Sequence, residues 1–248
     1  MDFDFGNIWN YFCKACLIFF ITIIFNSILG DILFRTKYSF PKISTTSQEI
    51  INTNNDPIQI NLENQKYIKA YGEKNIYALQ PMAKYSISGL VVTKNTNFWF
   101  RDIMRNSFDD ICLMDIGIVW GDLAKDKNKL HKYWKFKSHK TLGQSRRLEW
   151  RSKVPYEEMY WKLGFVSSHI SHTHLIPANP NVMGALLKIK KNDIVKLDGY
   201  LVDIYTDKSE TVAKTSMSRT DTDPTSRGSG ACEDMYVKQV QIGNKIYK

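Results

Sequence analysis

The longest hydrophobic run in the chain lies close to its first residue. Residues 15–34 are almost entirely apolar, and across residues 11–34 the charged side chains are Lys14 and Asp31. A bilayer core of about 30 Å needs roughly 20 mostly apolar helical residues, and the run has no polar face of the kind that an amphipathic core helix shows. The pattern predicts a single transmembrane helix at residues 15–34, preceded by a short flank at residues 1–14.

An uncleaved anchor fits this segment better than a cleaved signal peptide. A signal peptide begins with a basic region and has small residues before the cleavage point. Here Asp2 and Asp4 precede Lys14, and no A-x-A pattern follows the apolar run. Cleavage after Gly30 stays open, but the pattern favours a helix that remains in the membrane.

Two arguments about membrane orientation oppose each other. Lys14 lies on the amino side of the run, whereas Arg35, Lys37 and Lys42 follow it, and the positive-inside rule then favours a cytoplasmic carboxyl-terminal domain. A short flank followed by a long domain is also the layout of an exported, signal-anchored protein. The charge pattern alone leaves the orientation undecided.

The apolar run is followed by a polar segment and then by a long segment with the composition of a globular domain. Residues 35–57 include the polar stretch STTSQEIINTNN, which lacks a sustained period, and predict a polar tether. Residues 58–248 are rich in Ile, Leu, Phe, Tyr, Val and Trp, and a chain of this length can bury a core. The sequence therefore predicts one globular domain at residues 58–248.

Within the domain, short apolar, aromatic and β-branched stretches bounded by turn formers predict strands. They lie at residues 76–81, 85–93, 111–120, 148–151, 165–170, 194–205, 211–219 and 235–242. In residues 194–205 polar and apolar side chains alternate up to Gly199, which predicts a bulge or bend there.

Two helices are expected among the strands. Residues 181–190 place apolar side chains on one face, with Asn179 as the cap and Pro180 at the first position, and residues 156–163 form the second. The predicted fold is mainly β with one or two helices, as an antiparallel barrel or sandwich behind the transmembrane helix. The order of helix, turn and long bent strand suggests an OB-like barrel.

The net charge of +9 is concentrated in one basic and aromatic stretch, residues 125–153. Such a stretch can bind a polyanion and stack on its bases, or contact anionic lipid and acidic partners. It can equally be a solvated loop whose aromatic side chains pack inward, and this interpretation carries the most weight. If the domain has a contact surface, the candidates are Lys132, Tyr133, Trp134, Lys135, Phe136, Arg146 and Arg147.

Three histidines lie close together in sequence: His169, His172 and His174. In a strand, His172 and His174 project from the same face and His169 from the other. Zinc usually needs three or four ligands, so the three histidines are weak metal candidates, and a hydrogen-bonded structural role is favoured. No metal, cofactor or catalytic residue is expected.

The cysteines do not form the pattern of a disulfide scaffold. Cys13 and Cys16 lie at the membrane boundary, whereas Cys112 and Cys232 lie in the domain and could form a disulfide in an oxidising compartment. Cys232 could also act as a nucleophile, but a cysteine nucleophile needs a base within reach. The P-loop, G-x-S-x-G, HExxH and GxGxxG motifs are absent from the sequence.

Several charged side chains indicate a structural polar network. Asp115 lies in an otherwise apolar run, and an unpaired buried charge is costly, so a buried partner is expected among Arg146, Arg147 and Arg219. A second pairing is expected between Arg219 and an acidic side chain across neighbouring strands. The residues of the predicted network are Asp115, Arg219, Asp221 and Glu233.

The carboxyl half carries motifs in a recognisable order. They are HLIPA at residues 174–178, DIVKLDGYLV at residues 193–202, S-x-x-R-x-D at residues 216–221 and G-A-C-E at residues 230–233. In this order they resemble an uncharacterised family of exported or membrane-anchored bacterial proteins. The resemblance implies export and carries no transferable activity. His169 and His172 are not part of the shared motifs.

These observations favour a membrane-anchored accessory or assembly protein of the bacterial envelope. We expect a single-pass inner-membrane protein with a periplasmic domain, acting through contacts with other envelope proteins, such as those of a secretion or conjugation complex. Membrane lipid is the other expected partner, and nucleic acid is not expected. The alternatives are an envelope hydrolase that uses Cys232 or a histidine-based metal site, and a membrane-tethered nucleic-acid-binding OB-like domain.

Overall fold

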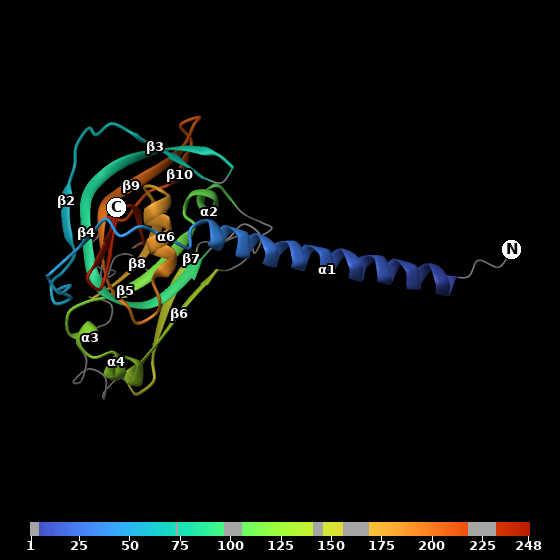
Figure 1. Cartoon of the computed structure of the whole chain (residues 1–248), viewed down its shortest axis with the longest axis horizontal. Helices are drawn as coiled ribbons and strands as arrows, with labels where there is room; N and C mark the ends of the chain where they lie inside the picture. Colours follow the sequence, from blue (N-terminus) through green and yellow to red (C-terminus); the bar gives the residue numbers. More distant parts are fainter. Residues whose placement is uncertain (1–4, 73, 97–105, 141–145, 156–168, 218–231) are drawn as a thin grey trace.

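A computed structural model describes residues 5–72, 74–96, 106–140, 146–155, 169–217 and 232–248 of the chain. A long amino-terminal helix projects from a β-rich domain, and the carboxyl terminus lies within that domain (Figure 1). The prediction of a mainly β fold with few helices is confirmed.

The described helices are α1 (Phe5–Lys37), α2 (Ser107–Ile111), α3 (Asp122–Lys125), α4 (Lys127–Tyr133) and α6 (Pro180–Lys188). The described strands are β1 (Thr45–Thr46), β2 (Ile58–Asn61), β3 (Ile68–Tyr71), β4 (Ile76–Thr96), β5 (Met114–Val119), β6 (Trp134–Lys140), β7 (Arg146–Ser152), β8 (Ile170–Pro177), β9 (Ile194–Thr206), β10 (Thr211–Ala213), β11 (Cys232–Ile242) and β12 (Lys245–Tyr247). The predicted helix at residues 156–163 lies outside the described residues.

Most of the described strands belong to one large sheet, and five of these strands pair with one another in a closed ring. β5 pairs antiparallel with β4 and with β8, and β8 pairs parallel with β11. β11 pairs antiparallel with β9, and β9 pairs antiparallel with β4. β4 and β9 are the longest strands of the sheet, and β4 curves strongly around the domain (Figure 1).

The main core lies between these strands and α6. Val182, Ala185 and Leu186 of α6 pack in one buried cluster with side chains of the large sheet, such as Leu201, and with Trp120, which follows β5. The predicted start of this helix is confirmed, because the Asn179 side chain accepts a hydrogen bond from the Val182 amide at 2.9 Å and Pro180 is the first helical residue.

The predicted polar tether, residues 35–57, docks on the domain. β1 pairs with β12, and the Ile51 side chain is only 9% exposed. The Trp120 indole N–H donates to Asp56 at 2.8 Å, and the Gly121 amide donates to the Thr53 carbonyl at 2.7 Å. A polar sequence without a period can still satisfy its backbone at a sheet edge.

Gly199 marks a close approach between strands, and the register irregularity lies opposite it, in β11 between Val237 and Gln239. A Cβ atom at Gly199 would lie 2.0 Å from the Tyr236 carbonyl oxygen. We expect Gly199→Ala to lower the free energy of unfolding by about 2–3 kcal/mol, because backbone must move to admit the methyl group. Urea unfolding measures the change.

Gly243 supplies a control for this substitution. It has a φ of +57° and no atom within 4 Å of an added Cβ. Asparagine tolerates the left-handed region, so Gly243→Asn should cost less than about 1 kcal/mol. If the two substitutions lowered the free energy of unfolding equally, the backbone freedom of glycine, and not the close contact with β11, would explain the need for Gly199.

Candidate functional site

Three neighbouring strands, β5, β8 and β11, bring polar side chains to one face of the sheet. In β8, His172 and His174 are two residues apart and project from the same face. β11 runs parallel to β8, with Cys232 opposite His172 and Asp234 opposite His174. β5 places Asp115 opposite His174 on the other side. The register of these strands therefore collects two imidazoles, a thiol and two carboxyl groups.

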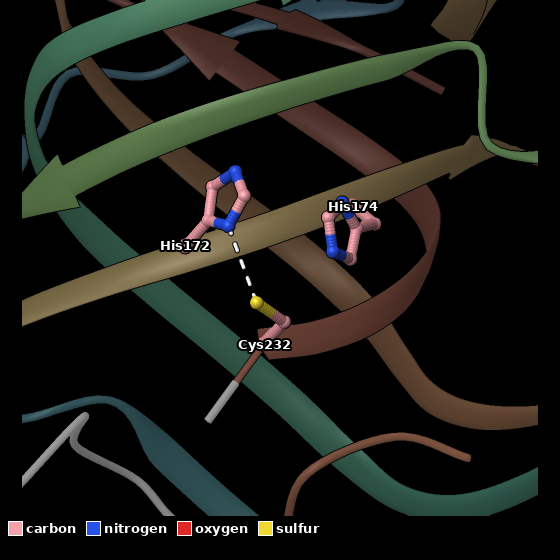
Figure 2. A group of neighbouring side chains, drawn as sticks. All are labelled: His172, His174 and Cys232. Carbon is pink, nitrogen blue, oxygen red and sulfur yellow. Dashed lines mark hydrogen bonds between the residues drawn. The ribbon is translucent and has the colours of Figure 1, made fainter. Parts of the chain in front are cut away.

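His172, His174 and Cys232 form the centre of this face, and we call them the Cys–His cluster. Each residue offers one ligand atom, and the three atoms lie within 4.8 Å of one another. The His172 Nδ1 atom is 3.2 Å from the Cys232 sulfur, and the two imidazole ring centres are 4.7 Å apart. Figure 2 shows the two rings on one strand, with the thiol entering from the neighbouring strand. Both histidines are buried and Cys232 is half-buried.

A second set of contacts fixes the ring of His174. Its Nδ1 atom lies 2.6 Å from a carboxylate oxygen of Asp115, which is fully buried. The guanidinium group of Arg146 contacts the same oxygen. Arg146 also donates to the Cys112 carbonyl at 2.6 Å and lies 3.2 Å from Asp109. His174 is thus held by a buried and charged network.

Phe108 completes this support. Its ring packs edge-on against His174, with 4.9 Å between ring centres, and the Arg146 guanidinium lies over the same phenylalanine ring, 4.9 Å from its centre. Such geometry adds packing to the ion pair. His174 has little freedom to rotate without disturbing Phe108 or Asp115.

Burial and neighbouring charge shift the pKa values of three groups on this face. Burial alone would raise the pKa of Asp115, but Arg146 and His174 outweigh it and hold the pKa at about 2. Burial lowers the pKa of His172 to about 3, with His174 acting in the same direction. Burial raises the pKa of Asp234 to about 6, against the opposing effect of His174 and Arg146. At neutral pH, Asp115 is therefore a carboxylate and His172 is a neutral imidazole.

Two buried polar atoms on this face lack a hydrogen-bond partner among the described residues: His172 Nε2 and Asp234 Oδ1. His172 is 2% exposed and Asp234 is 3% exposed. Buried polar atoms in native proteins are nearly always satisfied, and an exception calls for an explanation such as an ion or a chemical role. One of these atoms belongs to the Cys–His cluster itself, and the other belongs to Asp234, which lies opposite His174 on the same face.

The arrangement can support two kinds of chemistry. A thiol beside an imidazole can act as a nucleophile with a general base. One thiolate and two neutral imidazoles are also a donor set for a transition metal. The first kind needs a third group that orients the base, and the second needs rigid histidine ligands.

The other residues considered from the sequence lie elsewhere. His169 does not join the Cys–His cluster; its ring packs near Trp120, with 6.1 Å between ring centres. Cys112 is fully buried, and burial raises the pKa of its thiol well above the usual range. Among the described residues Cys112 and Cys232 do not form the disulfide that the sequence allowed.

The predicted polar network is only partly visible. Arg219 and Asp221 lie outside the described residues. Glu233 is buried next to Cys232 in sequence, but it accepts a hydrogen bond from the Ser171 hydroxyl at 2.7 Å. Asp115 does have a buried partner, and of the arginines considered the structure pairs it with Arg146.

Four of the seven residues expected on a contact surface are buried. Tyr133, Trp134 and Phe136 are 8%, 5% and 7% exposed, and Arg146 is 1% exposed. The aromatic side chains pack in a core cluster with residues of β4 and α3, and Arg146 belongs to the Asp115 network. The remaining three, Lys132, Lys135 and Arg147, are exposed. The proposed surface was wrong for these four, because Trp134 and Phe136 are the alternate residues of β6 that face the core, Tyr133 at the end of α4 packs in the same cluster, and Arg146 of β7 pairs with the buried Asp115.

The sequence analysis did not predict that Cys232 lies beside His172 and His174. The spacing of His172 and His174 was a usable signal, since it places both on one face of a strand. Cys232 is 60 residues away, and only the parallel register of β8 and β11 brings it to that face.

Comparisons of the chain with protein-family models, with curated proteins and with solved structures find no match.

Proposed function

We propose that the chain is a single-pass protein of the bacterial inner membrane whose β-rich domain works on the periplasmic side. Its role would be that of an accessory or assembly component of an envelope complex, such as a secretion or conjugation apparatus. The observation that carries the proposal is α1, a helix long and apolar enough to cross a membrane.

The most apolar part of α1 has no protein covering in the described structure. An 18-residue window within Trp9–Lys37 has a mean hydropathy of 2.3, and none of that window is buried. A helix of 33 residues is about 50 Å long, which exceeds the roughly 30 Å hydrocarbon core. Large apolar side chains such as Phe19 and Phe20, 64% and 62% exposed, would meet lipid along this length.

The domain is attached directly to the end of α1. The Lys42 amide donates to the Asn181 side chain at 2.6 Å, and the same side chain donates back to the Lys42 carbonyl at 3.0 Å. A Cβ atom on Gly184 would lie 2.6 Å from the Tyr38 carbonyl oxygen, so α6 packs closely on this segment. These contacts support a domain held against the membrane surface and not at the end of a free linker.

The composition beside the end of α1 suits a lipid interface. A cavity of about 780 Å³ is lined there by Lys37, Lys69, Lys74 and Tyr71 above apolar side chains such as Ile111. The Lys69 ammonium group lies 5.4 Å from the centre of the Tyr71 ring. Lysines and tyrosines are typical of the headgroup region, where lysines attract anionic lipids.

The resemblance to exported bacterial proteins supports the periplasmic placement. A phosphatase reporter fused after Lys248 should be active, because such reporters fold in the periplasm. A cytoplasmic reporter at the same position should be inactive. The reverse pattern would place the domain in the cytoplasm and remove the envelope role.

The accessory role requires partner proteins. Purification of the full chain from native membranes in mild detergent should recover a defined multiprotein assembly. Recovery of the chain as a lone monomer, with the reporter still periplasmic, would contradict the accessory role while leaving the membrane anchor in place.

A second candidate function, an enzyme acting on envelope material, is favoured by one contact. The His172 Nδ1 atom lies 3.2 Å from the Cys232 sulfur, close enough for proton transfer between a nucleophile and a base. If Cys232→Ser abolishes the cellular phenotype and Cys112→Ser does not, catalysis at Cys232 is supported.

The closed set of strand pairings supports the finer prediction for the fold. The described strands β4, β5, β8, β11 and β9 pair in a ring, and a small barrel of this strand number is typical of OB-like folds. We therefore propose an OB-like barrel for the domain. Burial of Trp134 and Phe136 of β6 removes the stacking surface that the basic and aromatic stretch suggested for a nucleic-acid-binding role.

A further inference from the structure

We propose that His172, His174 and Cys232 bind one divalent transition-metal ion, with zinc as the ion that this donor set suits. The inference goes beyond the proposed function, because neither the membrane anchor nor an accessory role requires a metal. It rests on the donor atoms, their separation, the support behind His174 and the unsatisfied atoms around them.

The donor types fit zinc. Zinc binds cysteine thiolates at about 2.3 Å and imidazole nitrogens at about 2.0–2.1 Å. In a tetrahedral arrangement these bond lengths put neighbouring donor atoms about 3.3–3.6 Å apart. The His172 Nδ1 to Cys232 Sγ distance is 3.2 Å, and all three donor atoms lie within 4.8 Å of one another. Side-chain movements of about 1 Å would bring the three donor atoms to the separations of a tetrahedral zinc site.

The histidines present the right nitrogen atoms. His174 engages Asp115 through Nδ1, which leaves Nε2 to bind the metal. A metal-binding histidine commonly uses its other ring nitrogen to contact a carboxylate, and that contact fixes the ring. Asp115 is itself held by Arg146. His172 would bind through Nδ1, the atom beside the cysteine sulfur. The Arg146–Asp115–His174 chain is therefore the outer support that a metal site requires.

The same geometry argues against a catalytic triad on Cys232. In a triad the base contacts the nucleophile and is oriented by a third group. Here the histidine in contact with Cys232 is His172, and its Nε2 atom has no hydrogen-bond partner among the described residues. The histidine that a carboxylate does orient is His174. A metal uses both histidines, whereas a triad would use one and leave the other unexplained.

The unsatisfied carboxyl oxygen of Asp234 points to the same conclusion. Asp234 is opposite His174 in the parallel pair, is 3% exposed and has one oxygen atom without a hydrogen-bond partner in the described part of the chain. A cation bound by the adjacent Cys–His cluster would add positive charge beside this buried carboxyl group.

The three ligands found among the described residues leave one position of a tetrahedral ion without a ligand from this part of the chain. Structural zinc sites normally have four protein ligands, and sites with three keep a position for water or another small ligand. Cys232 itself is half-buried, not fully buried. We infer a zinc ion whose fourth ligand is exchangeable.

The test uses the full chain, purified in detergent under reducing conditions. Elemental analysis should find about one equivalent of zinc per chain. After exchange for cobalt(II), absorption should show a thiolate-to-cobalt charge-transfer band and the visible bands of a tetrahedral ion. Cys232→Ser should lose the charge-transfer band, and His172→Gln and His174→Gln should each weaken cobalt binding by at least about tenfold.

Matched controls separate this site from other donors in the chain. Cys112→Ser removes a thiol outside the cluster, and His169→Gln removes a histidine outside it. Both should keep the charge-transfer band and the metal content. Cys13→Ser with Cys16→Ser tests the remaining thiols in the same way. Retention of the full band by Cys232→Ser, or its loss in Cys112→Ser alone, would overturn the assignment.

A measurement on the unmodified chain covers the case in which a variant fails to fold. Zinc should slow the alkylation of Cys232 by iodoacetamide at least about tenfold, because a metal-bound thiolate is shielded. Removal of the metal with a chelator should restore the rate. Absence of stoichiometric metal together with an alkylation rate that zinc does not change would overturn the proposal. Because these measurements do not depend on partners or orientation, they leave the accessory role untouched.

Discussion

Replacing Arg146 by methionine is expected to lower the free energy of unfolding by about 3–5 kcal/mol. Arg146 is 1% exposed and contacts Asp115, which is fully buried, together with Asp109 and the Cys112 carbonyl. Methionine keeps much of the side-chain volume but removes the charge. The two buried carboxylates then lose their cation, and an uncompensated buried charge is costly. Urea unfolding of the detergent-solubilised chain measures the loss.

The adjacent Arg147 provides a matched control, since it is exposed and Arg147→Met should change stability by less than about 0.5 kcal/mol. The double variant Arg146→Met with Asp115→Leu should recover part of the loss, because it removes one of the stranded charges as well as the cation. A loss below about 1 kcal/mol for Arg146→Met would contradict a buried network at this position.

Placing two aspartates in the middle of α1 is expected to abolish membrane insertion. Phe20→Asp with Ile24→Asp introduces two charges where the side chains are 62% and 57% exposed and outside the domain core. Each aspartate at the centre of a membrane helix costs about 2.5–3.5 kcal/mol, so the pair costs roughly 5–7 kcal/mol. Alkaline extraction of membranes should release the variant and retain the unaltered chain.

The conservative pair Phe20→Leu with Ile24→Leu should remain in the membrane, because leucine favours insertion as strongly as the original residues. Circular dichroism of the released aspartate variant should show the β-rich domain intact, since neither position contacts the core. Extraction of the unaltered chain by alkali would contradict a membrane-spanning helix and with it the proposed location.

The strand and helix pattern of the domain was predictable wherever local preference and tertiary structure agree. β9 begins at Ile194 as its alternation indicated, and the Asn179 cap and Pro180 start α6 as expected. Two predicted strands at residues 76–81 and 85–93 form one continuous strand, β4, with a register shift between Pro81 and Ala83. A bulge there allows pairing with β9 to continue, and local sequence does not show whether a proline interrupts or only kinks a strand.

The candidate site was less accessible to sequence reasoning. Asp115 was expected to have a buried arginine partner because of its apolar neighbours, and burial next to Arg146 confirms that expectation. The aromatic residues of β6 were ambiguous, because a basic and aromatic composition is compatible with an exposed surface and with a packed hairpin. Packing against β4 and α3 resolves the ambiguity for Trp134 and Phe136.

The sequence by itself determined the features that depend on neighbouring residues: the presence of the apolar helix, the alternating strands and the cap of α6, although α1 (Phe5–Lys37) extends beyond the predicted residues 15–34 at both ends. These follow from side-chain chemistry at fixed periods and need no partner. Only the tertiary structure decided that residues 35–57 dock on the domain, and that His172, His174 and Cys232 meet. Such contacts depend on which strands pair, in which direction and in which register. A shift of one residue between β8 and β11 would turn Cys232 to the opposite face.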